Sequence, residues 1–536
     1  MKYCTALLVA LAALVPPIAA AGVDPLPQLV QHDGRHALLV DGKPYLILGV
    51  QAGNSSAWPA MLPKVWPAVE FVHANTLEIP VYWEQFEPEA GRFDFSIVDQ
   101  LLREAREHHV HLVLLWFGTW KNGSSHYLPL WMKAQPDKCP HLVNRDGTRA
   151  DSPSPFAPAL LEADTRAFRT LMHHLRENDP QRTVLMVQVE NEPGVWNSVR
   201  DHSPGAEHVF QSPVPADFLT ALGHSSAAGA NWPAVFGPDA DEFFGAWSVA
   251  RYIGQVAAAG KAEYPLPLYV NAALRDPLTP PPATSYEAGG PTDNVLSIWK
   301  AAASAIDILS PDIYLNDGPR YQKVLELYAR TDNPLFVPET IGMGPLTRYC
   351  FAAIGHGAIG WSPFGVDYTT YVNHPAGQTR LNEENLTPLA LNFRLLAPMG
   401  REVARLNYEG RVQAAVEEKG APTGSLRFGK WKANLSYGVP AFGAGKDPAG
   451  NPEPVGRVLI AQTGDDEFLV AGYFCRVDFQ LADPDTPARR EYRHVVEGEF
   501  GDDGFHLLRI WNGDQTDWGL NLSSVPQILK VQLATY

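Results

Sequence analysis

The chain has 536 residues, enough for a large core and two or three domains. It is 45% hydrophobic, 19% charged and 10% aromatic, a globular composition that excludes an intrinsically disordered protein. The formal net charge of −17 argues against a phosphate backbone, and so against nucleic acid, as a partner. The 14 Trp and 19 Tyr residues suit sugar rings, but they suit an ordinary core equally well.

The N-terminus predicts an export signal. Lys2 supplies a positive charge, and residues 5–15 form an apolar run that is too short to span a bilayer. The small residues at 18–21 fit signal-peptidase cleavage near Ala21. We therefore expect a signal peptide over residues 1–21 and an exported protein, periplasmic or extracellular, with a buried N-terminal helix as the alternative. No later stretch is long and apolar enough for a membrane span.

The cysteines that remain after export, Cys139, Cys350 and Cys475, do not have metal-ligand spacing. Export permits one disulfide among them, and the sequence does not indicate which pair. The sequence also has neither a phosphate-binding glycine loop nor a GxSxG turn. We therefore expect no metal and no cofactor.

After a short hairpin around Asp41-Gly42, apolar β-prone segments alternate with helix-prone segments. The expected strands are 45–50, 76–83, 111–116, 184–192, 266–271, 306–315, 335–339 and 358–362. The expected helices are 62–73, 97–108, 163–178, 241–260, 295–305, 321–330, 346–355 and 389–406. This alternation is typical of an α/β fold, a (β/α)₈ TIM barrel, which we expect over residues 22–405. The longest connections follow the third, fourth and fifth strands, on the face where barrels carry catalytic residues.

A different pattern begins after residue 405. Short alternating segments separated by Gly, Asp and Pro predict a sandwich-like all-β domain over residues 406–536. The strands expected there are 457–462, 467–478, 490–499, 505–511 and 527–533. Trp511 and Trp518 lie in ordinary strand patterns. We therefore expect this domain to brace the barrel, with polysaccharide binding as the alternative.

Two of the barrel strands end in a glutamate. The apolar run Val184–Val189 leads into Glu190, Asn191 and Glu192, and the run LFVP leads into Glu339. These are the fourth and seventh strands, which lie on opposite sides of a barrel opening. Cleavage of a glycosidic bond requires two carboxyl groups that flank the bond. The alternative for each strand alone is a terminal acid in contact with solvent.

These residues also carry a family resemblance. The motifs VQVENEP and PLFVPET resemble the acid/base and nucleophile strands of the retaining (β/α)₈ glycosidase clan. Within it, the stretch YWEQFEPEAGRFDFS resembles glycoside hydrolase family 35, the β-galactosidases, in its exported bacterial branch with an extra C-terminal β domain. The resemblance implies Glu192 as acid/base, Glu339 as nucleophile and Asn191 as a ligand of the sugar hydroxyl beside the anomeric carbon. Glu190, one pleat deeper, is expected to orient its neighbours.

Further candidates lie at the ends of other strands. Tyr314 is a candidate to orient Glu339. Trp361 is a candidate to stack under the sugar, because Trp361-Ser362 resembles a strained peptide common in the clan. The remaining substrate-binding candidates are Asn54, Glu84, Trp83, Trp116 and Trp120. For each aromatic residue, ordinary core packing is the alternative.

The sequence thus predicts a retaining exo-β-galactosidase that acts on plant-type oligosaccharides or polysaccharide side chains. Many family members carry an Asn-Ala-Glu-type segment after the third strand, where this chain has Trp116-Phe-Gly-Thr. Another β-glycosidase or an endo-glycanase of the clan, acting on β-glucosides, β-xylosides or β-mannan, therefore remains an alternative. A non-catalytic carbohydrate-binding protein is the non-enzyme alternative.

Overall fold

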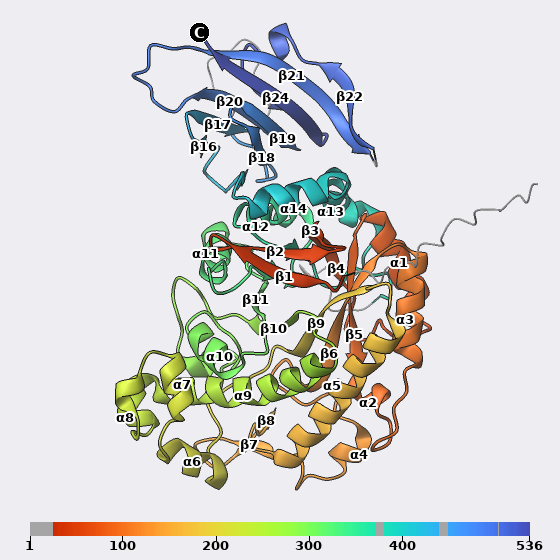
Figure 1. Ribbon diagram of the computed structural model, residues 1–536, viewed down its shortest axis with the longest axis vertical. Coiled ribbons are helices and arrows are strands. Elements are labelled where there is room, and N and C mark those ends of the chain that lie inside the picture. The colour runs from red at the N-terminus through yellow and green to blue at the C-terminus, as the bar shows by residue number, and fades with distance from the viewer. Residues whose placement is uncertain (1–24, 371–379, 439–448, 502) are drawn as a thin grey trace, which may run out of the picture.

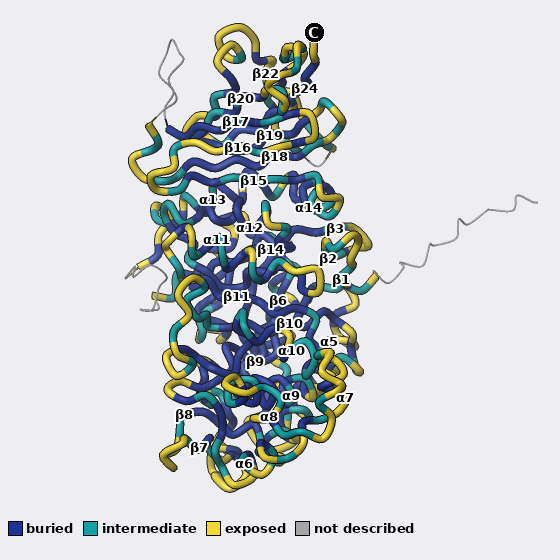
Figure 2. The backbone as a smooth tube through the Cα atoms, turned by 90° about the vertical axis from the view of Figure 1, so that its left-hand side faces the viewer, coloured by how far each residue is buried: buried dark blue, intermediate teal, exposed yellow. Residues whose placement is uncertain are grey.

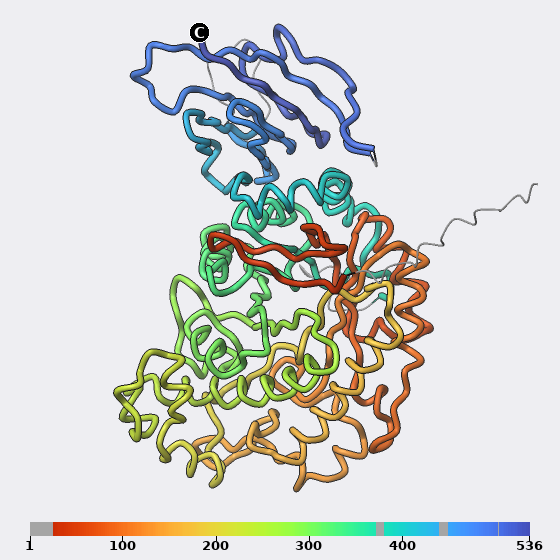
Figure 3. Tube along the Cα trace, in the orientation of Figure 1, coloured from red at the N-terminus to blue at the C-terminus, as the bar shows by residue number. Residues whose placement is uncertain are grey.

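The computed structural model describes residues 25–370, 380–438, 449–501 and 503–536. The expected signal peptide over residues 1–21 lies outside these ranges. Within them the chain forms a barrel with a β sandwich stacked on it (Figures 1 and 3). Among the described residues, no helix combines the length and hydropathy that a membrane crossing requires.

The barrel is one closed parallel sheet, as the sequence predicts. Its strand order is β12-β14-β4-β5-β6-β9-β10-β11-β13. Strands β12 (Phe336–Val337) and β13 (Glu339–Thr340) are two halves of one of the eight barrel strands, which we call staves. Pro338 interrupts this stave because proline has no amide hydrogen to donate. The first half pairs with β14 and the second with β11, and this closes the barrel. The other staves are β4 (Ile47–Gln51), β5 (Thr76–Tyr82), β6 (His111–Lys121), β9 (Val184–Asn191), β10 (Leu268–Ala273), β11 (Ile308–Ile313) and β14 (Gly360–Trp361).

The helices cover the outside of this sheet. They are α1 (Leu62–Phe71), α2 (Trp83–Phe86), α3 (Ser96–Glu107), α5 (Pro158–Asn178), α9 (Ala240–Glu263), α10 (Leu296–Ala302), α11 (Gly318–Tyr328), α12 (Tyr349–Gly355), α13 (Glu383–Leu396) and α14 (Gly400–Tyr408). In α3, residues spaced three or four apart, such as Ile97, Leu101 and Ala105, are buried against the strands. The single helix predicted over 389–406 is wrong, because Pro398 separates α13 from α14.

The long connections contain more structure than the sequence predicts. The one after β6 carries α4 (Leu130–Lys133) and the hairpin β7 (His141–Val143)–β8 (Arg149–Pro153). The one after β9 carries α6 (Pro204–Gln211), α7 (Ala216–Ala221) and α8 (Trp232–Phe236). These helices are too short to show a helical repeat of hydrophobic residues in the sequence. Their starts are marked instead, because Ser203 and Asn231 cap α6 and α8 and each helix has a proline in its first two positions. Figure 1 shows β7, β8, α6 and α8 at the end of the molecule opposite the sandwich.

A small antiparallel sheet precedes the barrel. It consists of β1 (Gln28–His32), β2 (Arg35–Val40) and β3 (Lys43–Tyr45). Asp41 and Gly42 both have positive φ, as a two-residue hairpin turn requires, so the predicted hairpin is confirmed.

The C-terminal domain is a sandwich of two antiparallel sheets. The six-stranded sheet has the order β15-β18-β19-β24-β21-β22, and the four-stranded sheet the order β16-β17-β20-β23. The strands are β15 (Val412–Val416), β16 (Thr423–Phe428), β17 (Trp431–Tyr437), β18 (Arg457–Gly464), β19 (Glu467–Tyr473), β20 (Cys475–Leu481), β21 (Arg490–Gly501), β22 (Gly504–Ile510), β23 (Leu520–Leu522) and β24 (Gln527–Thr535). The predicted single strand over 467–478 is wrong, because Phe474, with φ of 54°, turns the chain from one sheet to the other.

The six-stranded sheet is buried on both faces. Leu459 and Ala461 belong to the core of the barrel side, whereas Val458 and Ile460 belong to the core of the sandwich. Figure 2 shows buried backbone continuing through this junction. The junction also has polar contacts, because the buried Arg457 donates to Thr347 Oγ1 at 2.9 Å and to Asn392 Oδ1 at 3.0 Å. The sandwich is therefore fixed to α13 and to the turn before α12.

All three cysteines of the expected mature chain are buried and free. Cys139, Cys350 and Cys475 form no disulfide with one another. The disulfide that export would permit is therefore absent among the described cysteines.

Candidate active site

The fourth barrel stave, β9, ends in two residues with left-handed backbone. Glu190 has φ of 65° and Glu192 has φ of 42°. In a regular strand these residues would point to the same face, but left-handed residues break the alternation. Glu190 therefore points outward, where Trp120 N donates to its Oε2 at 2.6 Å and Asp164 of α5 lies beside it. Glu192 lies at the opening formed by the carboxyl ends of the strands, which we call the mouth.

Three carboxylates meet at the mouth. Glu192, Asp312 of β11 and Glu339 of β13 each place an oxygen within 4.8 Å of the other two, and all three residues are buried. The sequence predicts two of them, and the structure brings those two together. The trio is also close enough to share a metal ion, but two carboxyl groups at this separation already satisfy the needs of glycoside hydrolysis.

Two side chains hold Glu339 in place. Tyr314 donates its hydroxyl hydrogen to Oε1 at 2.5 Å, and Gln51 Nε2 donates to Oε2 at 3.1 Å. The contact predicted for Tyr314 is therefore present. With both oxygens engaged, Glu339 has a fixed orientation toward the mouth.

A buried lysine faces the predicted sugar ligand Asn191. Lys121 Nζ donates to Asn191 Oδ1 at 2.7 Å, at the point where β6 pairs with the end of β9. This bond occupies the carbonyl oxygen of the amide. Asn191 Nδ2 is buried and has no hydrogen-bond partner among the described residues. It is therefore an available donor at the mouth.

Burial and crowding change the protonation of these acids. Burial, followed by the charge of Glu339, raises the pKa of Glu192 to about 7, against the opposing effect of the Lys121 ammonium. Burial and the charges of Glu339 and Glu192 raise the pKa of Asp312 well above its ordinary value. Asp312 Oδ2 accepts a hydrogen bond from Asn271 Nδ2 at 2.6 Å, and its Oδ1 has no partner among the described residues. Burial and the charges of the two glutamates therefore both favour the protonated form of Asp312.

A fourth acid, Glu287, comes from the irregular connection after β10. It is buried, and its two oxygens accept no hydrogen bond from any residue that the structure describes. Burial and the charge of Glu192 raise the pKa of Glu287 well above its ordinary value, and the Lys121 ammonium opposes this. Glu287 therefore faces the same electrostatic environment as the trio.

Deeper acids support the mouth. Burial raises the pKa of Glu78 to about 8, and Tyr269 donates its hydroxyl hydrogen to Glu78 Oε2 at 3.0 Å. Burial and the neighbouring Asp164 raise the pKa of Glu190 well above its ordinary value. Glu190 thus contacts β6 and α5, and its role in orienting its neighbours stays a prediction.

The four predicted tryptophans are all buried, and the indole nitrogen of each donates to a protein acceptor. Trp361 Nε1 donates to Tyr321 Oη at 3.0 Å, and its ring packs edge-on against Phe393 of α13, so it faces the helix layer. Trp83 donates to Glu87 and Trp116 to Asp164 of α5. Trp120 donates to Ser152 of β8, whose hydroxyl donates to the backbone of Gly194 just beyond Glu192. A role of these residues in sugar binding stays a prediction.

Asn54 and Glu84 are both half-buried. Asn54 follows β4 at the mouth, and its buried Oδ1 has no described partner. Glu84 lies 3.6 Å from Lys133 Nζ of α4 and is engaged in that ion pair. Asn54 thus offers an unpaired acceptor and Glu84 faces a cation, and the binding role of each stays a prediction.

Other aromatic residues, which the sequence did not single out, surround the mouth. Trp58 is 43% exposed and stacks on Tyr82 at 5.7 Å, and Tyr82 stacks on Tyr127 at 5.5 Å. Trp196, which follows β9, is 48% exposed. Tyr82 ends β5, and the other rings lie on connections that follow strands, where Trp58 and Trp196 offer exposed flat apolar faces.

The sequence also missed four polar residues. Gln51, Lys121 and Asp312 occupy the last or next-to-last positions of their staves, and a polar residue there is a signal that could have identified them. Glu287 lies in a connection without regular structure, so no strand pattern marks it.

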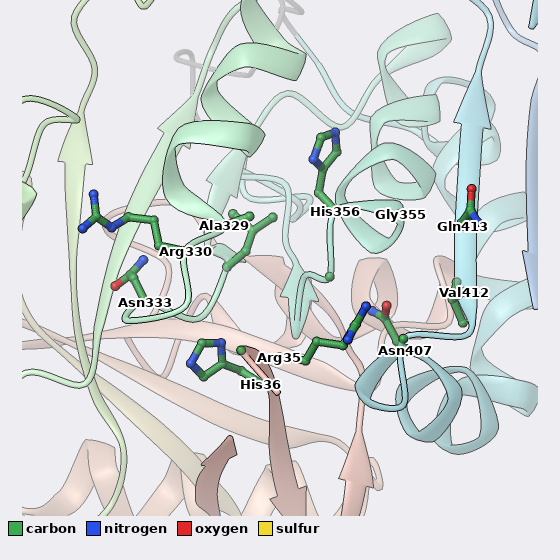
Figure 4. Close-up of a pocket in the computed structure, with 14 residues that line it drawn as sticks. Arg35, His36, Ala329, Arg330, Asn333, Gly355, His356, Asn407, Val412 and Gln413 are labelled. Carbon is green, nitrogen blue, oxygen red and sulfur yellow. The ribbon is translucent and has the colours of Figure 1, made fainter. Parts of the chain in front are cut away.

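A separate polar cavity of about 410 Å³ lies at the opposite ends of the strands (Figure 4). It is lined by Arg35 and His36 of the small sheet and by residues just before β12 and β14. Since barrel enzymes carry their chemistry at the carboxyl ends of strands, this cavity is not the candidate active site.

Two family models match the sequence. Residues 68–231 match glycoside hydrolase family 42, described as beta-galactosidase. Residues 389–523 match a domain family of unknown function, DUF5597. The first match includes Glu192 and ends before Glu339. It makes the barrel that of a glycoside hydrolase, and it points to family 42 rather than to family 35 of the same clan.

Several solved structures resemble part of this chain at low sequence identity. The β-galactosidase from Bacillus circulans sp. alkalophilus is 14% identical, with a TM-score of 0.48 over 67% of this chain and 57% of its own. The cold-adapted β-galactosidase from Rahnella sp. R3 is 18% identical, with a TM-score of 0.48 over 68% of this chain and 58% of its own. This chain therefore spans less than two thirds of the length of either protein, and we draw no activity from them. No curated protein sequence matches this chain.

We predict that Asp312→Asn changes how stability depends on pH. An acid whose pKa is raised on folding holds its proton more tightly in the folded state than in the unfolded state. Its contribution to stability therefore falls as the pH rises above the pKa that the residue has in the unfolded chain, about 3.9. The amide cannot titrate. Thermal unfolding at pH 4.5 and pH 8 should therefore show that the variant gains stability relative to wild type at pH 8.

The exposed Asp514 provides the control. Asp514→Asn should leave the difference in thermal stability between pH 4.5 and pH 8 the same as in wild type. A variant at position 312 that loses stability equally at both pH values would show that Asp312 is ionised in the folded protein.

Proposed function

We propose that the protein is a retaining, exo-acting β-galactosidase that removes terminal β-galactosyl units from plant-type oligosaccharides or polysaccharide side chains. The observation that carries this proposal is the pair Glu192 and Glu339, whose oxygens approach within 4.8 Å from opposite sides of the mouth. Retaining glycosidases hold their two carboxyl groups about 5–5.5 Å apart, whereas inverting enzymes leave about 6.5–9.5 Å for a water molecule. The separation thus supports double displacement.

The environments of the two acids support different roles. Glu192, with a pKa of about 7, is available as a proton donor to the glycosidic oxygen near neutral pH. Glu339, held by Tyr314 and Gln51, attacks the anomeric carbon and forms a glycosyl ester as the bond to the leaving oxygen breaks. Glu192 then removes a proton from the water that hydrolyses the ester. Asn191 Nδ2 is the donor available to the hydroxyl beside the anomeric carbon.

The surroundings of the mouth support action on chain ends. The long connections after β6 and β9 carry β7–β8 and α6–α8, which can enclose one terminal sugar. Trp58 and Trp196 are exposed there and offer stacking faces for the next sugars of the chain. Substrates of this size lie outside the cell, which agrees with the export signal that we propose for residues 1–21.

One observation favours another sugar as the second candidate. Within the last part of β6, the position of the family's Asn-Ala-Glu-type segment is taken by Trp116-Phe-Gly-Thr, and a Cβ on Gly118 would lie 2.4 Å from Trp116 Nε1. A side chain therefore cannot be accommodated at Gly118. Lys121 takes over the contact with Asn191, so hydroxyl recognition differs from that pattern.

A panel of nitrophenyl β-glycosides tests the sugar. We expect the purified protein to hydrolyse the β-galactoside with a higher kcat/KM than the β-glucoside, β-xyloside or β-mannoside. Turnover of the glucoside or xyloside without turnover of the galactoside would refute the galactose assignment and retain the mechanism. Absence of turnover on every substrate would favour the non-catalytic alternative.

Substitution of the two acids tests their roles. Glu192→Gln should lower kcat/KM by about 10²–10⁴-fold for substrates with poor leaving groups, because the proton donor is lost. Glu339→Gln should abolish turnover of all substrates, because the nucleophile is lost. Glu84→Gln, which changes an acid that is paired with Lys133, is the matched control.

Azide rescue then assigns each acid to a step. Glu339→Gly should yield the α-galactosyl azide, because azide displaces the leaving group directly. Glu192→Ala should yield the β-galactosyl azide, because azide attacks the glycosyl ester. Exchanged products would reverse the two roles.

The pH profile tests the acid. Since Glu192 must be protonated in the first step, kcat/KM should fall as pH rises through about 7. Lys121 lowers the pKa of Glu192, so Lys121→Met should move this alkaline limb to higher pH. The exposed Lys64→Met variant should not move it. An unmoved or lowered limb in Lys121→Met would show that the limb reports another group.

A further inference from the structure

The four-stranded sheet of the sandwich has one apolar and one polar face. Trp431, Ala433 and Leu435 of β17 point into the sandwich core, as do Val477 and Phe479 of β20. The residues between them lie on the outer face, which is directed away from the six-stranded sheet and hence from the barrel. The outer residues of the two central strands are Lys432, Asn434, Ser436, Arg476, Asp478 and Gln480.

These polar residues face one another across the strands. Lys432 is the register partner of Gln480, Asn434 of Asp478, and Ser436 of Arg476. Side chains directly opposite in adjacent strands lie close enough to act on one ligand. The outer face is therefore a regular series of donors and acceptors, about 7 Å apart along each strand.

The outer face is hollow rather than flat. A groove of about 640 Å³ runs over it, and its lining also includes residues 423–425 of β16, Arg490 of β21 and the segment Asp517-Trp518. Gly519 lets that segment approach β20, because a Cβ there would lie 3.1 Å from Asp478 Cβ, and its φ of 86° favours glycine. Trp518 is consequently placed at the edge of the groove and is 49% exposed. We call this feature the sandwich groove.

The charges in the sandwich groove are partly balanced. Arg490 Nη2 lies 3.2 Å from Asp478 Oδ1, and Gln480 Nε2 donates to Asp478 Oδ2 at 2.8 Å. Three basic and two acidic side chains line the groove in a chain whose net charge is −17. Neither a phosphate-rich polymer nor an apolar protein surface fits such a mixture.

We propose that the sandwich groove binds a polysaccharide chain. Sugar rings present hydroxyls that both donate and accept, which matches amide, hydroxyl and charged groups arranged in rows. Their apolar faces match an exposed indole such as that of Trp518. The groove is open along the sheet, so that it accommodates a segment of a long chain rather than an enclosed small molecule.

The position of the groove defines its role. The barrel connections that carry α6, α8 and the β7–β8 hairpin lie at the far end of the molecule from the sandwich (Figure 1). The groove therefore cannot extend the row of sugars bound at the mouth, and it acts as a separate anchor on the polymer. The six-stranded sheet packs on the barrel, as expected for a bracing domain, and the four-stranded sheet carries the surface for the polysaccharide binding that the sequence left as the alternative.

The test is affinity electrophoresis in native gels that contain soluble β-1,4-galactan or arabinogalactan. Full-length protein carrying Glu339→Gln is used, so that the polymer survives whether or not the proposed hydrolysis is correct. We expect at least one polymer to retard this protein. Adding Trp518→Ala should weaken binding about tenfold, because one aromatic contact is lost.

Two further variants complete the test. The double substitution Lys432→Ala and Asn434→Ala should also weaken retardation, whereas Leu508→Ala, which removes an exposed apolar side chain from β22, should not. Unchanged melting temperatures verify folding. Absence of retardation by both polymers, or equal retardation of the Trp518→Ala protein, would overturn the proposal. A doubled mass in light scattering that Trp518→Ala abolishes would assign the groove to self-association and would also overturn it.

Discussion

The catalytic end of this barrel depends on the burial of several carboxyl groups beside a single buried lysine. Glu192, Asp312, Glu339 and Glu287 share the mouth with Lys121. Four negative charges in so little water would repel one another strongly, so protons must remain on some of these groups. The neighbours of each acid decide which one keeps its proton. The two glutamates that we propose as proton donor and nucleophile belong to one crowded set, and the properties of each depend on the others.

Local patterns predicted the two principal acids and the barrel. Asn191-Glu192 and Glu339 each end an apolar run, and that pattern is visible within ten residues of sequence. The orientation of the aromatic candidates could not be predicted in this way. Whether Trp116 or Trp361 faces the mouth or the helices depends on side-chain alternation in the finished sheet, and an apolar run does not reveal it. Lys121 was missed because β6 continues to Lys121, five residues beyond the expected end at 116.

The limits of the fold prediction have similar causes. The alternation of strands and helices revealed the barrel, because each element repeats its own period. The first three sandwich strands, β15, β16 and β17, were not predicted individually, since short strands joined by ordinary turns have weak patterns. A left-handed residue such as Glu190 or Phe474 redirects the next residues of the chain, and only the folded backbone shows this change. The family resemblance named the clan correctly, while the matching model is that of family 42.

The attachment of the sandwich couples it to the barrel. The family match of the C-terminal part begins at residue 389, inside α13, and ends at residue 523, before β24. Asn392 lies in α13, and its Oδ1 accepts hydrogen bonds from Arg457 and Tyr473 of the sandwich. The helix therefore has two environments at once, with the barrel on one side and the sandwich on the other. A substitution in α13 would consequently act on the stability of both parts, so that neither part can vary there independently of the other.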